Sequence, residues 1–297
     1  MKVLFQILIA RLLLLILLGA DGSQAATITK IGAGWNCGLF IKSDGSLWVM
    51  GSNGDGQLGD GTTTRTNRPE QILANKVTTI SGGQDHNLFL KEDGSLWGMG
   101  LNYQGQLGLG FYSTAPPYEI TVPQRIVTSN VTAISAGGEH SLFLKSDGSL
   151  WAMGDNYYGQ LGVGTINQTN LPVQIVASNV TAIAAGFYHS LFLKNNGSLW
   201  VMGDNHYGQL GVGLMNQTNL PVQIVASNVT MIAAGGSHSL FLKSDGSLWG
   251  MGDNFGGQLG LGLINHTNIP VQITVSNVVA MAGGAVHSLL LKNDGSL

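Results

Sequence analysis

Apolar residues along the chain form short runs, and polar turn residues separate these runs at regular distances. Residues 140–154, HSLFLKSDGSLWAMG, place two apolar runs on either side of Asp147 and Gly148. An Asp-Gly pair between apolar runs predicts a β-hairpin, because both residues tolerate a positive φ in a tight turn. The runs do not alternate with polar residues, which is typical of strands that are buried on both faces of a sheet.

The hairpin belongs to a unit that recurs along the chain. After the hairpin comes a Gly-rich corner at 154–164, an apolar run at 171–176, and a further run at 179–186 that leads into the next hairpin. The tryptophans at 48, 97, 151, 200 and 249 lie 49, 54, 49 and 49 residues apart, and no helical period is present. The pattern predicts an all-β fold of four-stranded blades stacked face to face.

The Gly-rich corner is a candidate phosphate-binding loop. In residues 203–213, GDNHYGQLGVG, no Lys-Ser or Lys-Thr pair follows the last glycine, and the glycine order is GxxGxG rather than GxGxxG. Similar strings recur at 51–61, 100–110, 154–164 and 252–262. A turn needed once per unit explains five copies better than five phosphate sites do, so we expect a structural corner and no cofactor.

Composition and charge limit the classes of partner. The chain has 297 residues, of which 44% are hydrophobic and 10% charged, so it can bury a large core. Thirteen Lys and Arg against sixteen Asp and Glu give a net charge of −3. No basic field exists to attract nucleic acid or an anionic membrane, and we expect neither partner.

The first 25 residues have the three-part order of a secretory signal peptide. Lys2 gives a positive start, residues 12–18 are apolar, and Ser23-Gln24-Ala25 is a small-x-small cleavage site. An uncleaved anchor is the alternative, but Arg11 interrupts the apolar run. We expect a signal peptide over 1–25, a repeat domain over 26–297, and a secreted or cell-surface protein without stable membrane insertion after cleavage.

The repeated string AGGxHSLFLKSDGSLWxMGDNxxGQLGxG resembles the repeat of the regulator of chromosome condensation family. The resemblance covers nearly everything after residue 25 and implies a β-propeller, usually of seven blades. About five and a half units are present, and the chain ends at NDGSL, just before the expected sixth repeat tryptophan. We therefore expect a fragment of a seven-bladed ring, with an unusual smaller propeller as the alternative. Cys37 stands where the other units carry His86, His140, His189, His238 and His287.

The repeated polar residues could suggest catalysis or metal binding. Histidines that recur once per blade are spread around a ring, whereas metal ligands must converge on one ion. The Asp-Asn pairs of the corners, such as Asp155-Asn156, are residues that hold turns through local backbone hydrogen bonds. Adjacent His and Ser in one strand point to opposite faces. We expect structural roles, no metal site and no catalytic residues.

The positions that differ between units are the candidate binding residues. Because each hairpin folds back on itself, the residues before the recurring His and those after Met-Gly-Asp-Asn emerge at the same end of the sheet. Aromatic side chains on exposed loops are typical of binding hot spots. Packing against neighbouring blades is the alternative. The predicted partner-binding residues are Trp35, Tyr103, Tyr157, Tyr158, Phe187, Tyr188, His206, Tyr207 and Phe255.

These observations favour a secreted, non-enzymatic module that binds a protein or glycan through an aromatic loop face. The family resemblance implies a protein partner, since a secreted bacterial β-lactamase inhibitor of that family binds its target through a propeller face. Guanine-nucleotide exchange on a small GTPase is an alternative that the resemblance also implies, although export argues against it. A structural cell-surface module of a longer protein is the third hypothesis.

Overall fold

The computed structural model of the protein describes residues 26–113, 119–214 and 216–297. The predicted signal peptide, residues 1–25, lies outside the described residues. The described part consists of β-strands and loops without an α-helix, so it contains no helix that could cross a membrane.

The strands form five four-stranded antiparallel sheets and one two-stranded sheet, which we number as blades 1 to 6. Blade 1 contains β1 (Ile28–Ala33), β2 (Cys37–Lys42), β3 (Leu47–Gly51) and β4 (Thr66–Leu73). Blade 2 contains β5 (Val77–Gly82), β6 (His86–Lys91), β7 (Leu96–Leu101) and β8 (Glu119–Val127). Blade 3 contains β9 (Val131–Ala136), β10 (His140–Lys145), β11 (Leu150–Gly154) and β12 (Thr169–Val176).

The remaining blades follow the same order. Blade 4 contains β13 (Val180–Ala185), β14 (His189–Lys194), β15 (Leu199–Asp204) and β16 (Gln217–Val225). Blade 5 contains β17 (Val229–Ala234), β18 (His238–Lys243), β19 (Leu248–Asp253) and β20 (His266–Ile273). Blade 6 contains β21 (Val278–Gly283) and β22 (Ser288–Lys292).

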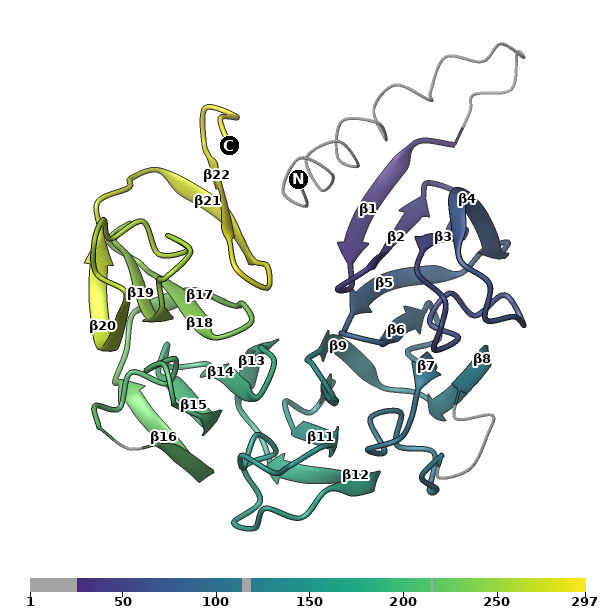
Figure 1. Ribbon diagram of the computed structural model, residues 1–297, viewed down its shortest axis with the longest axis horizontal. Helices are drawn as coiled ribbons and strands as arrows, with labels where there is room; N and C mark the ends of the chain where they lie inside the picture. Colours follow the sequence, from purple (N-terminus) through teal and green to yellow (C-terminus); the bar gives the residue numbers. More distant parts are fainter. Residues whose placement is uncertain (1–25, 114–118, 215) are drawn as a thin grey trace.

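The blades lie side by side in an arc that is open between blade 6 and blade 1 (Figure 1). The first strand of each blade lies on the inside of the arc and contacts the first strand of the next blade. The predicted all-β propeller of four-stranded blades, with about five and a half repeats, is confirmed. The number of blades in a complete ring stays a prediction.

The predicted hairpin joins the second and third strands of the five four-stranded blades, but its turn differs from the prediction in one detail. The Gly148 amide donates to the Lys145 carbonyl at 2.9 Å, and the Lys145 amide donates to the Ser149 carbonyl at 3.1 Å. Gly148 has a φ of 76°, whereas Asp147 is not among the residues with positive φ. The expectation that both residues favour this turn through a positive φ was therefore wrong for Asp147. The loop has three residues and ends in one left-handed glycine, and the Asp147 carboxylate instead accepts a hydrogen bond from the Ser149 amide.

The hydrophobic core lies between adjacent blades. Leu88 and Leu107 of blade 2, for example, belong to the same buried cluster as Phe143 and Met153 of blade 3. The middle strands are buried along almost their whole length, which confirms that both of their faces are covered. The core is therefore divided into layers between blades, and each layer depends on the stacking of neighbouring units.

The recurring histidines link one blade to the next. The Nε2 atom of His140 in blade 3 lies 2.9 Å from Ser190 Oγ in blade 4, and Ser190 Oγ donates to the Gln160 carbonyl at 2.8 Å. Since the serine hydroxyl uses its single proton on the carbonyl, the histidine is the donor, from Nε2. Equivalent pairs form at His86 with Ser141, at His189 with Ser239, and at His238 with Ser288.

The first of these links uses different residues. Cys37 replaces histidine in blade 1, and its Sγ lies 3.8 Å from Oδ1 of Asn87, which stands where blades 3 to 6 carry serine. The Asn87 side chain donates to the Gln57 carbonyl at 2.7 Å, as the serines do to the corresponding carbonyls. Burial raises the pKa of the Cys37 thiol. The pair Cys37 and Asn87 thus replaces the His-Ser pair.

Candidate functional site

The two ends of the arc carry different loops. In blade 3 His140 pairs with Gly154, so the loops before β10 and after β11 lie at the end opposite the hairpin turn. The same register recurs in the other four-stranded blades, which confirms the predicted common end. We call this end the aromatic face, formed by the described parts of loops 34–36, 52–65, 83–85, 102–118, 137–139, 155–168, 186–188, 205–216, 235–237, 254–265 and 284–287.

Six of the nine predicted binding residues come together on this face. Trp35 of blade 1 contacts Phe187 of blade 4, with their ring centroids 5.0 Å apart, and Phe187 contacts Tyr188 at 6.2 Å. The Tyr188 ring lies 5.0 Å from that of Tyr158. These contacts connect blade 1 with blades 3 and 4, although Trp35 and Phe187 are far apart in the sequence.

Tyr158 extends this row of rings outward. Its ring lies 5.0 Å from that of Tyr157 and 6.2 Å from that of His206, in edge-on arrangements. Tyr157 is 67% exposed and Trp35 is 44% exposed, whereas Tyr158 and its inner neighbours are half-buried. We call this group the aromatic cluster: Trp35, Tyr157, Tyr158, Phe187, Tyr188 and His206.

The other three predicted residues lie on the same face. Tyr103, Tyr207 and Phe255 are exposed on the loops of blades 2, 4 and 5. Among the described residues, no ring contact joins Tyr207 or Phe255 to the aromatic cluster. Whether any of the nine residues binds a partner stays a prediction.

Polar side chains inside each corner hold the outer aromatic residues in place. In blade 3 Asn156 Oδ1 accepts the Leu161 amide at 2.9 Å, and Gln160 Oε1 accepts the Tyr158 amide at 3.0 Å. The Gln160 amide donates to Asp155, whose other oxygen accepts the Tyr157 amide at 3.1 Å. The Asp-Asn pair therefore has the predicted turn-holding role.

Backbone hydrogen bonds between adjacent blades hold the inner loops. The Trp35 amide donates to the Gly83 carbonyl at 3.1 Å, and the Gln84 amide donates to the Gly137 carbonyl at 3.2 Å. A Cβ at Gly83 would lie 2.5 Å from His86 Cε1 and 2.6 Å from the Gly137 oxygen, so only glycine fits there. This close packing fixes the side chains that stand beside these glycines on the aromatic face.

Carboxylates gather next to the aromatic cluster. Burial raises the pKa of Asp85, which lies on the inner loop of blade 2. Burial also raises the pKa of Glu139 on the inner loop of blade 3, with further contributions from Asp155 and Asp85. The pKa of Asp55 is raised by burial and by Asp85 and Glu119. Each of these groups therefore lies close to other negative charges.

The same charges act on the tyrosines. Burial raises the pKa of Tyr188, and Glu139 is the largest contributor among the acidic residues that raise it further. The pKa of Tyr158 is raised by burial and then by Asp204. The aromatic cluster and the carboxylates thus form one continuous surface.

A family model for the RCC1-like domain matches residues 18–290 of the chain. This span includes β1 to β21 and most of β22. The chain belongs to the RCC1-like domain family. The resemblance of its repeats to those of the regulator of chromosome condensation is thereby confirmed.

Solved structures agree with an RCC1-like propeller. Human WBSCR16 matches with a TM-score of 0.80 and 26% identity, over 92% of this chain and 74% of that protein. Yeast RCC1 (Prp20), solved in complex with Kap60, matches with a TM-score of 0.79 and 21% identity, over 90% of this chain and 67% of its own. Prp20p from Saccharomyces cerevisiae matches with a TM-score of 0.79 and 22% identity, over 90% of this chain and 70% of its own. The two yeast structures support the fold.

Sequence reasoning missed the carboxylates of this RCC1-like propeller. Asp55, Asp85 and Glu139 stand at the variable positions where the aromatic residues of other blades stand. Their position was therefore visible in the repeat pattern, but their proximity to one another was not. The signal that could have found them is the absence of Lys and Arg from the same variable positions.

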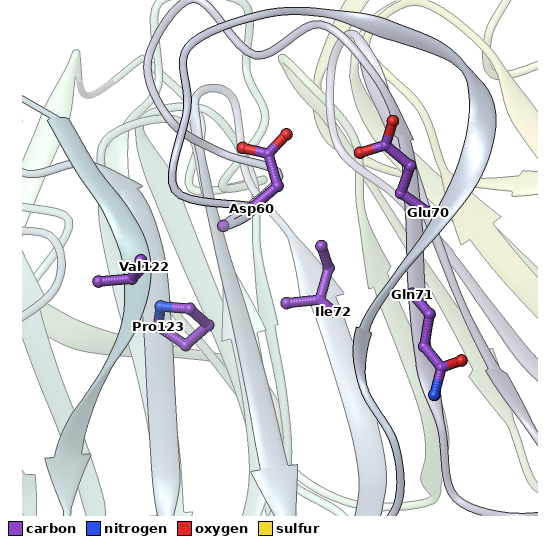
Figure 2. Close-up of a pocket in the computed structure, with 7 residues that line it drawn as sticks. Asp60, Glu70, Gln71, Ile72, Val122 and Pro123 are labelled. Carbon is purple, nitrogen blue, oxygen red and sulfur yellow. The ribbon is translucent and has the colours of Figure 1, made fainter.

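A second feature of the propeller is a recess at its outer rim, between β4 and β8. It has a volume of about 350 Å³ and is lined by Gly59, Asp60, Glu70, Gln71, Ile72, Val122 and Pro123. In Figure 2 the carboxyl groups of Asp60 and Glu70 lie at one side, and Val122 and Pro123 lie across from them. None of the predicted binding residues lines this recess. Among the described residues, no group of three His, Cys, Asp or Glu side chains is arranged to hold a metal ion.

Proposed function

We propose that this RCC1-like propeller is a secreted, non-enzymatic module that binds a protein or glycan partner through its aromatic cluster, with a protein as the favoured class. The observation that supports this proposal most is the unbroken row of rings from Trp35 to Tyr157, contributed by blades 1, 3 and 4. Clustered aromatic residues on a rigid scaffold supply large contact area at little cost in conformational entropy.

The exposure of the cluster favours binding over a purely structural role. Side chains that only fill the space between blades are buried, as Phe143 and Phe192 are. Tyr157 instead presents most of its surface to solvent, while its backbone amide is held by Asp155. Exposed apolar surface rimmed by polar groups is typical of interaction sites.

Related proteins support a protein partner. Yeast RCC1 (Prp20) was solved bound to Kap60, and Prp20p has binding properties toward Gsp1p and histones. Proteins of this fold therefore bind other proteins, and the present chain offers a loop face suited to the same kind of association. A glycan could also stack on the exposed rings, and it is the second outcome of the test below.

The test compares three purified forms of the protein. The first is the wild type, the second carries Trp35→Ser, Tyr157→Ser and Tyr158→Ser, and the third carries Leu171→Ser, Leu220→Ser and Ile269→Ser. The last three residues are more than half exposed and lie on the outer strands β12, β16 and β20. A partner captured by the wild type is identified and purified, and its affinity for each form is measured by calorimetry.

We expect the aromatic variant to lose the partner and the outer-strand variant to keep it, with circular dichroism showing both folded. Equal affinities for all three forms would contradict the assigned face. A captured glycan in place of a protein would retain the face and change the partner class.

Secretion is tested on residues 1–25. The chain should appear in the medium with Ala26 as its first residue, as mass spectrometry of the N-terminus can show. Replacing Leu14 and Leu15 by Arg breaks the apolar run and should keep the chain inside the cell. Recovery of an intracellular chain that still begins at residue 1 would overturn this part of the proposal.

The non-enzymatic part is tested against guanine-nucleotide exchange. Small GTPases loaded with a fluorescent guanine nucleotide should release it at the same rate with and without the protein. Faster release that depends on the dose of the protein would replace the proposed role with that of an exchange factor.

A further inference from the structure

The surface beside the aromatic cluster has a marked excess of negative charge. The loops of the aromatic face carry Asp55, Asp60, Asp85, Glu139 and Asp155, and Glu119, Asp204 and Asp253 lie at the adjoining strand ends. Arg65 is the one Lys or Arg in the loops that form this face, and it lies on the outer part of blade 1. Among the described residues, no ion pair with a Lys or Arg side chain neutralises these carboxylates.

The lysines lie at the other end of the propeller. Five of them, Lys42, Lys91, Lys145, Lys194 and Lys243, stand beside hairpin turns, each with its ammonium nitrogen 3.7–4.5 Å from the centre of a tryptophan ring. The turns at that end carry acidic residues as well, such as Asp147 beside Lys145. Charge is therefore mixed at the turn end and almost entirely negative at the aromatic face.

Three of the carboxylates form a row along the inner edge of the aromatic cluster. The Gln84 amide donates to the Gly137 carbonyl, which holds the loop that carries Asp85 against the loop that carries Glu139. The row continues to Asp55 on one side and to Tyr188 on the other. In the described residues the single ion pair is His206 with Asp204, so Asp55, Asp85 and Glu139 have no cationic partner.

This arrangement is unfavourable for the free protein. Like charges that face each other in partly buried positions destabilise the compact state, and a cation that binds between them stabilises it. Aromatic faces attract cations as well, because the ring quadrupole presents negative charge. A Lys or Arg side chain placed between the row and the tyrosines would interact favourably with both.

We propose that the partner of the aromatic cluster is a protein with a basic loop, whose Lys or Arg side chains lie against Asp85, Glu139 and Tyr188 while its apolar side chains pack on Trp35 and Tyr157. This inference rests on the proposed function and specifies the partner's chemistry. Neutral glycans and acidic proteins do not complement this surface, because neither supplies positive charge.

The test uses two charge variants of the full chain and two peptides. The first variant carries Asp85→Asn and Glu139→Gln, which remove two charges and keep the side-chain shapes. The matched control carries Asp147→Asn and Asp245→Asn at the turn end, where Asn196 shows that the turn accepts asparagine. The probes are a fluorescent peptide of Lys, Arg, Tyr and Gly and an equal-length peptide with Gln in place of Lys and Arg. Anisotropy is measured in 50 and 200 mM NaCl.

We expect the basic peptide to bind the wild type, and the Gln peptide to bind it at least about tenfold more weakly. The reason is that a close charge pair at an interface contributes a tenfold or greater difference in affinity. The variant with Asp85→Asn and Glu139→Gln should bind the basic peptide about tenfold more weakly than the wild type does. The turn-end control should bind it with unchanged affinity. Higher salt should weaken the wild-type complex. Thermal melting of the free proteins should show that the first variant is no less stable than the wild type.

Three results would overturn the inference. They are equal binding of the two peptides, no binding of either peptide, and an equal loss of affinity in both charge variants. The proposed function has its own readout in the variant with Trp35→Ser, Tyr157→Ser and Tyr158→Ser. If that variant loses a captured partner while the charge variant retains it fully, the aromatic face stands and the basic partner is refuted.

Discussion

The four buried histidines His86, His140, His189 and His238 make the free energy of unfolding depend on pH. Burial lowers the pKa to about 3 for His86 and His189 and to about 4 for His140 and His238. In an unfolded chain the pKa of histidine is about 6.5. Between these values the unfolded chain binds protons that the folded chain does not bind. The stability contribution is therefore complete above pH 6.5 and decreases as the pH falls toward 4.

The size of the effect follows from the two pKa values of His140. Between pH 7 and pH 5, proton uptake by one histidine of the unfolded chain lowers the free energy of unfolding by about 1.8 kcal/mol, when the folded pKa is near 4. All four histidines act in the same direction. The carboxylates with raised pKa, such as Glu139, act in the opposite direction because they favour the folded chain as they gain protons.

The chain itself supplies a substitution that removes one titrating group. Cys37 and Asn87 occupy the inter-blade position that His140 and Ser190 occupy further along, so we propose the double variant His140→Cys with Ser190→Asn. Urea unfolding followed by tryptophan fluorescence at pH 7, 6 and 5 gives the free energy of each form. The decrease from pH 7 to pH 5 should be smaller in the variant by about 1.8 kcal/mol. The carboxylates are common to both forms, so their contributions cancel.

An exposed histidine provides the control. His266→Asn replaces an exposed histidine outside the His-Ser links, and its decrease from pH 7 to pH 5 is compared with that of the double variant. An identical decrease in the wild type and the double variant would refute the reasoning, since it would place the pH dependence outside the His-Ser links.

Other changes test the packing directly. Ser190→Ala leaves the Gln160 carbonyl and the His140 Nε2 proton without a partner and should lower the free energy of unfolding by about 1–3 kcal/mol in urea titrations. Gly83→Ala forces a Cβ against the His86 ring and should lower the free energy of unfolding by a similar amount. The control is Gly54→Ala, where the added Cβ meets nothing within 4 Å, and this variant should melt like the wild type in calorimetry. Lys145→Ala removes the ammonium over the Trp151 ring and should change the melting midpoint little, by an amount equivalent to about 0.5–1 kcal/mol.

Local features of the fold could be predicted because each depends on residues close in the chain. The Asp147-Gly148 turn, the corner held by Asn156 and the strand order within a blade involve contacts inside one unit. The common end of the variable loops follows from the hairpin register alone. The same repeats allowed the candidate binding residues to be placed on one face.

Contacts between units were harder to predict. The partner of His140 is a serine 50 residues further along, and adjacent His and Ser in one strand suggested no such link. A signal was nevertheless present, because the unit that lacks the histidine is followed by the unit that carries Asn87 in place of serine. The paired change in Cys37 and Asn87 marks two positions that meet between blades.

The sequence by itself determined the repeat, the strands, the turns and the end at which the loops differ, because these follow from short-range periodicity and turn chemistry. Only the tertiary structure decided which loops meet. Trp35 and Phe187 lie in blades 1 and 4, and the curvature of the arc brings their rings together. The same packing places Asp85 beside Glu139 on adjacent inner loops. The surface on which both proposals rest is thus a product of how the blades stack around the axis.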